Sequence, residues 1–92
     1  MLQLIIESQT DEMVVLAVYG KVVGAAVGIL AQEGTRHRQR GVQLVLDLEG
    51  VPFIDPDGLA LLRQWMGPRL QLRGGSPFLQ ALLQAEGLPV DG

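Results

Sequence analysis

Residues 44–62 read LVLDLEGVPFIDPDGLALL, an apolar run that leads into a loop and then into a second apolar run. The nearly continuous apolar segment at residues 42–48 is typical of a β-strand buried on both faces. Residues 49–57 contain two prolines and two aspartates, which predicts a loop. Within this loop we expect Phe53 and Ile54 to anchor the chain to the core.

Strand-like and helix-like segments alternate around this stretch. Residues 3–8 and 12–19 are rich in apolar and β-branched side chains and flank a turn, so they predict a hairpin. The remaining expected elements are helices at 22–39, 57–66 and 78–86, the last with Ser76 as N-cap and Pro77 at its start, and a short strand at 69–72. We therefore expect an α/β fold of order β-β-α-β-α-β-α, a small mixed sheet with helices packed against it. We expect a single domain over residues 1–88, followed by a flexible C-terminal tail at 89–92.

The composition fits one small globular domain. The chain has 92 residues, enough for one core, and 48% are apolar against 18% charged, which separates it from disordered sequences. The net charge of −3 argues against a nucleic-acid partner. The chain has no cysteine and a single histidine, so thiolate sites and His-rich metal sites are excluded. We expect no metal and no cofactor.

Groups that could serve as nucleophiles are scarce. A Ser-His-Asp triad would have to combine Ser8 or Ser76 with His37. His37 stands between Arg36 and Arg38, which marks an expected solvated face. The sequence contains neither a G-x-S-x-G pattern nor a phosphate-binding loop. We therefore expect a protein that is not an enzyme.

The helix expected at 22–39 ends in a cationic run, residues 36–40. One interpretation is a basic patch that binds an anion or an acidic partner. The interpretation we favour is that these cations complement the helix dipole, with Gly41 as the C-terminal cap.

Residues 13–31 are apolar enough to raise the question of a membrane segment, since Lys21 is their single charge. A lysine near the midpoint costs roughly 2.5–3.5 kcal/mol on insertion, and Gly20 marks a boundary between two elements. Gly24 and Gly28 form a G-x-x-x-G pattern, which in a soluble helix lets the backbone approach a sheet closely. We expect a cytoplasmic protein without direct membrane insertion.

Two aspartates, Asp55 and Asp57, stand just before the expected second helix. Asp57 is placed to cap that helix, because its carboxylate can accept backbone N–H groups there. A metal site made of Asp47, Asp55 and Asp57 is the alternative. A receiver-type phosphoryl acceptor is a further alternative, but such domains carry a lysine on a later strand, whereas Lys21 precedes the acids.

This stretch resembles the STAS family, the domain of anti-sigma factor antagonists and of the cytoplasmic ends of sulfate transporters. The family pattern D-L-S-G-V-x-F-I-D-S-S-G-L is matched by residues 47–59, DLEGVPFIDPDGL. Residues 20–22, GKV, stand where the family has G-E-L, and residues 74–88 resemble its closing turn, helix and G-L. The resemblance implies a STAS fold over nearly the whole chain. It also implies a partner-binding loop made of Asp55, Pro56, Asp57, Gly58 and Leu59.

The chain departs from the family at the position that carries its switch. Asp57 stands where anti-sigma factor antagonists have a serine or threonine that a partner kinase phosphorylates. An aspartate supplies one negative charge, against roughly −1.5 to −2 for a phosphoserine. Val23 replaces an often polar residue, and the helix after Asp57 is shorter than the family pattern. The resemblance thus implies a phospho-mimic or a phosphorylation-independent module.

Four functions compete. The first is a non-enzymatic module that binds an anti-sigma factor, a kinase-like regulator, as an antagonist. The second is a soluble STAS accessory subunit of an ABC-type lipid-transport system, with the transporter ATPase as partner. A ligand- or nucleotide-binding module is third, and a hydrolytic enzyme is last. The sequence leaves the identity of the partner and the oligomeric state open.

Overall fold

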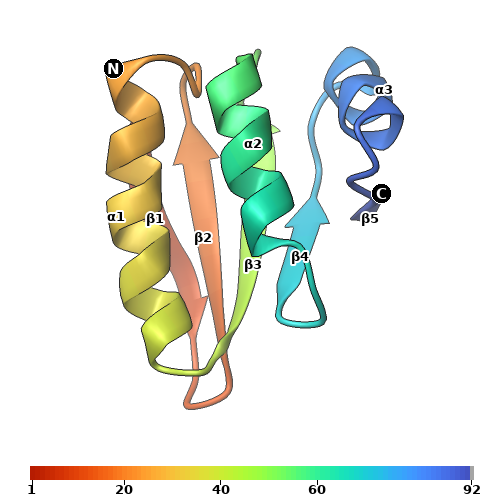
Figure 1. Ribbon diagram of the computed structural model, residues 1–92. Helices are drawn as coiled ribbons and strands as arrows, with labels where there is room; N and C mark the ends of the chain where they lie inside the picture. The colour runs from red at the N-terminus through yellow and green to blue at the C-terminus, as the bar shows by residue number, and fades with distance from the viewer. Residues whose placement is uncertain (92) are drawn as a thin grey trace.

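Strands and helices alternate after an opening hairpin in the computed structural model, which describes residues 1–91 (Figure 1). The elements are β1 (Gln3–Gln9), β2 (Met13–Tyr19), α1 (Ala25–Gln39), β3 (Gln43–Gly50), α2 (Pro56–Trp65), β4 (Leu70–Arg73), α3 (Pro77–Ala85) and β5 (Val90–Asp91). The expected α/β class and element order are confirmed, and a short final strand is added.

The sheet is mixed, and its strands lie in chain order, β1-β2-β3-β4-β5. β1 is antiparallel to β2, whereas the other neighbours are parallel. A helix joins each parallel pair, and right-handed crossovers that step in one direction place all the helices on one face. Figure 1 shows α1 and α2 in front of the strands and α3 beside β4 and β5. The expected packing of helices against a small mixed sheet is therefore confirmed.

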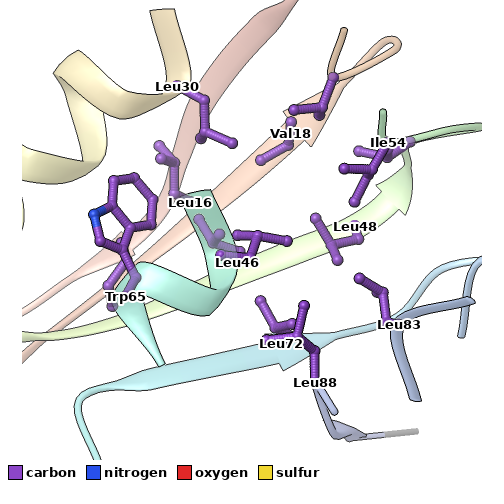
Figure 2. Close-up of a cluster of buried hydrophobic side chains, with 14 of the residues drawn as sticks. Leu16, Val18, Leu30, Leu46, Leu48, Ile54, Trp65, Leu72, Leu83 and Leu88 are labelled. Atoms are coloured by element: carbon purple, nitrogen blue, oxygen red, sulfur yellow. The ribbon is translucent and has the colours of Figure 1, made fainter. Parts of the chain in front are cut away.

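Alternate strand residues face the helices and form the core. Leu16, Leu46 and Leu72 are register neighbours on three strands, and each is at most 3% exposed. Figure 2 shows them in one cluster with Leu30 of α1 and Leu83 of α3. This single cluster joins the sheet to all three helices.

The opposite face of the sheet is shielded by long polar side chains. Val45 is 2% exposed although it does not belong to the core cluster under the helices. Its register neighbour Gln71 accepts a hydrogen bond from Gln43 (3.4 Å) and donates one to Asp91 (2.6 Å). The strand expected at 42–48 is thus buried on both faces, by helices on one side and by polar side chains on the other.

The last helix begins where the sequence predicts. The Ser76 hydroxyl accepts a hydrogen bond from the Leu79 N–H at 3.1 Å, and Pro77 occupies the first helical position. Proline is well suited to that position because its missing N–H would have no partner within the helix.

α1 starts at Ala25 and not at Val22 as expected. Val22 instead forms a parallel bridge with Ile54, in which the Val22 N–H donates to the Phe53 carbonyl at 2.9 Å. Gly24 then adopts a positive φ of 55°, a conformation outside the helix that glycine tolerates. Residues 22–24 therefore form the connection before the helix, in which Val22 is the bridged residue.

The glycines of α1 act differently from the prediction. A Cβ at Gly24 or Gly28 would meet no atom within 4 Å, so neither glycine serves a close approach to the sheet. The close approach is between two helices, because a Cβ at Gly34 would overlap the Trp65 ring of α2. The prediction that Gly24 and Gly28 let the helix approach the sheet was therefore wrong. Both glycines are exposed, whereas Gly34 is buried against α2.

His37 does not lie on a solvated face, as its arginine neighbours suggested, but is fully buried. Its Nε2 is 3.0 Å from Glu33 Oε2, and its Nδ1 is 3.4 Å from Nη1 of Arg40. A carboxylate only accepts and a guanidinium only donates, so both ring nitrogens find complementary partners. These contacts allow the imidazole to be buried.

The C-terminal segment is partly ordered into the sheet. Leu88 is buried, and β5 pairs with Leu72 and Arg73 of β4. The predicted element order lacks this strand because two residues show no detectable alternation. Gly92, the end of the tail expected at 89–92, lies outside the described residues.

Residues 13–31, examined above as a membrane segment, are divided between β2, a turn and the start of α1. No helix within residues 1–91 combines the length and apolar character needed to cross a bilayer.

Candidate functional site

Asp55 connects the beginnings of two helices. Its Oδ1 accepts a hydrogen bond from the Gly58 N–H at 2.8 Å, which caps α2. Its Oδ2 accepts a second hydrogen bond from the Gly24 N–H at 2.9 Å, at the start of α1. The Asp55 N–H in turn donates to the Val22 carbonyl at 3.1 Å. One side chain thus holds the β2–α1 and β3–α2 loops together.

The pKa of the Asp55 carboxyl group is lowered by these contacts. The hydrogen bond from the Gly24 N–H is the largest cause, followed by the one from the Gly58 N–H. Both favour the ionised form, because only a carboxylate accepts at both oxygens. Asp55 is therefore a charged structural link at neutral pH.

Asp57 is not the cap that the sequence suggested. Pro56 occupies the first position of α2, so the cap falls on the preceding Asp55, and Asp57 lies inside the first turn. Its side chain is exposed. A negative charge there interacts favourably with the helix dipole while remaining open to a partner.

The five residues of the expected partner-binding loop divide into two groups. Pro56 and Asp57 are exposed, and Asp55 is partly exposed. Gly58 and Leu59 are buried. At Gly58 a Cβ would lie 2.6 Å from Cγ2 of Ile54, so the helix start packs tightly on the core. Gly58 and Leu59 therefore attach the loop to the core, and Pro56 and Asp57 form its exposed part.

Of the two expected loop anchors, one is confirmed and one is wrong. Ile54 is 1% exposed and packs in the core, whereas Phe53 is 40% exposed. The parallel bridge between Val22 and Ile54 explains the difference, because neighbouring residues in an extended segment point to opposite sides.

The three aspartates of the alternative metal site do not share a common site. Asp47 accepts a hydrogen bond from the Glu49 N–H at 3.0 Å and lies 3.5 Å from the Arg73 guanidinium. Asp55 is occupied by two backbone N–H groups. Across residues 1–91, no three potential ligand side chains are grouped closely enough to hold a metal ion. Asp47 and Asp55 therefore have structural contacts, and the Asp57 side chain is exposed.

A pocket of about 580 Å³ lies beside the linked loops. It lies against the start of α1 and the β3–α2 loop, and its lining is mostly apolar with one cation. The lining residues are Met1, Leu2, Gly20, Lys21, Val23, Ala26 and Pro52. None of residues 55–59 lines this pocket, so it lies outside the expected partner-binding loop.

The sequence analysis missed Gly24 as part of this site. Gly24 stands 31 positions before Asp55, and no local pattern connects the two residues. The agreement of residues 20–22 with the G-E-L segment of the STAS pattern was the available signal, because it suggested a second loop of that fold.

No protein-family model matches the sequence. No curated protein matches it at a significant level either.

Solved structures do match over nearly the whole chain. The anti-sigma factor antagonist SpoIIAA in its unphosphorylated form superposes with a TM-score of 0.72 at 23% identity, covering 98% of this chain and 89% of its own. An anti-sigma factor antagonist from Mycobacterium paratuberculosis gives 0.80 at 20% identity, with 98% and 85% covered. The chain has the STAS-like fold of SpoIIAA.

A third structure, the Bacillus cell fate determinant SpoIIAA in its phosphorylated form, matches with a TM-score of 0.67 at 24% identity. It covers 94% of this chain and 85% of its own. The STAS-like fold expected from residues 47–59 is thus confirmed. Within that fold, the hydrogen bonds of Asp55 hold the β2–α1 and β3–α2 loops of this chain together.

Proposed function

We propose that this chain is a non-enzymatic protein-binding module that acts as an antagonist of an anti-sigma factor. Its binding surface is centred on the start of α2, with Asp57 in the place of the phosphorylated serine or threonine. The observation that carries the proposal is the exposed Asp57 carboxylate, which lies in the first turn of a helix whose start is fixed by Asp55. The likeness to anti-sigma factor antagonists supports the partner class.

The arrangement suits recognition better than chemistry. Asp55 is occupied by two backbone N–H groups, and Ser76 caps α3. His37, the other group needed for a hydrolytic triad, is buried against Glu33. Pro56 and Asp57 instead form a rigid, exposed and charged corner at which a partner's affinity depends on local charge.

The charge of Asp57 defines the regulatory state that we propose. The Asp57 carboxylate carries one negative charge, whereas a phosphoserine carries roughly −1.5 to −2. Asp57 therefore reproduces only part of the charge of a phosphorylated residue. The module therefore acts as a permanent, partial mimic of the phosphorylated form. Removing this charge is expected to strengthen binding to a kinase-like anti-sigma factor.

The test is capture of partners from host lysate with immobilised wild type, Asp57→Ser and Asp57→Asn, followed by mass spectrometry. Asp11→Asn is the matched control, because Asp11 is also an exposed carboxylate but lies in the β1–β2 turn at the other end of the sheet. We expect a kinase-like regulator whose affinity rises about 3- to 10-fold in both Asp57 variants and is unchanged in the control.

Two other results would redirect the assignment. Equal capture of a transporter ATPase by all variants would favour an accessory subunit of a lipid-transport system and reduce Asp57 to a structural residue. Purified anti-sigma factor that binds no variant would reject the antagonist function.

A further inference from the structure

The two edges of the sheet differ sharply. β5 is a two-residue strand, so that edge offers almost no backbone for pairing. β1 has seven residues and lies at the other edge with one neighbour, β2. Every second N–H and C=O group of such an edge strand points away from the sheet and can pair with another strand.

Apolar side chains are exposed along the β1 edge on both faces of the sheet. Ile5 is a register partner of Ala17 on the helix-free face and is 50% exposed. Ile6 pairs with Leu16 on the helix side and is 41% exposed. Ile29 of α1 is 49% exposed and lies about 140° around the helix from Gly34, on the side away from α2.

The usual protection of an edge strand is confined to the second half of β1, where Glu7 and the register shift after Ile6 lie. The strand contains no lysine and no proline, and Glu7 is its single charged residue. The Glu7 carboxylate lies 3.4 Å from the Arg73 guanidinium and so is directed across the sheet. A register shift between Ile6 and Ser8 interrupts the second half of the strand, which leaves residues 3–6 as the regular open part.

We propose that β1 pairs antiparallel with β1 of a second copy of this chain, forming a two-fold symmetric dimer with a continuous sheet. A two-fold axis normal to the sheet keeps the helices of both copies on the same side, so paired residues must share a face. Centring the axis on Ile5 fulfils this condition. It places Ile5 opposite Ile5 of the second copy and Leu4 opposite Ile6.

The same register avoids unfavourable charge pairs. Within the regular part the pairs are Ile5 with Ile5 and Leu4 with Ile6, so no charged residues meet there, and Glu7 lies beyond it against Arg73. The axis also lies within the regular half of the strand, before the register shift. This pairing is independent of the α2 loop proposed above as the partner-binding site, because Asp57 follows β3 and not β1.

Sedimentation velocity tests the proposal on the full chain, from about 1 µM to about 1 mM, a range that covers weak dimers. The wild-type mass should rise toward twice 9.9 kDa with concentration. Ile5→Lys and Ile5→Glu should each remain monomeric, since like charges would meet at the axis. An equimolar mixture of the two variants should dimerise again. Phe78→Lys is the control, since Phe78 is 62% exposed beside the opposite edge.

Each outcome decides the proposal. A wild type that stays monomeric at every concentration overturns it, and so does a dimer that survives in both Ile5 variants. A mixture that fails to dimerise, with both variants folded by circular dichroism, rejects the register centred on Ile5. Slower hydrogen exchange of the β1 amides in the wild type at high concentration provides a second measurement that requires no variant.

Discussion

The Gly24 N–H donates a hydrogen bond to Oδ2 of Asp55 at 2.9 Å, across 31 positions of sequence. The other oxygen of the same carboxylate caps α2 through the Gly58 N–H. Asp55 therefore links the starts of α1 and α2. Asp57, two residues later, lies in the first turn of the helix that Asp55 caps.

Asp55→Asn should destabilise the fold. An amide accepts hydrogen bonds through one oxygen only, so either the Gly24 or the Gly58 N–H would face an NH₂ group. We expect the Tm to fall by about 4–8 °C in thermal unfolding followed by circular dichroism. Asp57→Asn is the matched control and should change the Tm by less than about 2 °C, because an exposed first-turn charge contributes little. Equal losses in the two variants would contradict the assignment of Asp55 as the link.

Acid should weaken the wild type more than the Asp55→Asn variant. The folded-state pKa of Asp55 is lowered by its backbone hydrogen bonds. A group with a lowered pKa contributes stability above its unfolded pKa, and that stability is lost as the pH falls through the folded value. The Tm difference between wild type and Asp55→Asn should therefore be constant near pH 7 and shrink below about pH 4. A difference that persists unchanged to pH 2 would show that the charge of Asp55 does not matter.

Gly34→Ala and Gly28→Ala should have opposite effects although both add one methyl group to α1. At Gly34 the new Cβ would overlap the Trp65 ring, which forces the helices apart. We expect a loss of about 1–3 kcal/mol in the free energy of unfolding, measured with urea. At Gly28 the space is open, so the higher helix propensity of alanine should add about 1 kcal/mol. A stabilised Gly34→Ala variant would mean that α1 and α2 are not in close contact.

Phe53 and Ile54 are adjacent and should respond differently to truncation. Ile54→Ala removes a core side chain and should cost about 2–5 kcal/mol of unfolding free energy. Phe53→Ala removes a half-exposed ring and should cost less than about 1 kcal/mol. Urea unfolding of the two variants checks this contrast. A large loss at Phe53 would indicate that its ring is covered, for instance by another chain.

Local patterns were sufficient for most of the architecture. Residues 42–48 predicted a strand buried on both faces, and Ser76-Pro77 predicted the start of α3, because each depends on neighbours a few positions away. The loop before α2 was also predicted correctly, because its prolines and aspartates are neighbours in the sequence. Its cap was placed at Asp57 and not at Asp55, an error of two positions caused by the first-turn proline.

The sequence by itself determined the order of strands and helices from β1 to α3 and the place of the acidic loop, since alternation, helical spacing and turn residues are read over short distances. Only the tertiary structure decided that Asp55 reaches Gly24, that Gly34 and not Gly28 touches a neighbouring helix, and that His37 is buried. Each of these depends on how distant segments pack against the sheet. That packing depends on the whole core, so it cannot be predicted from a short stretch of sequence.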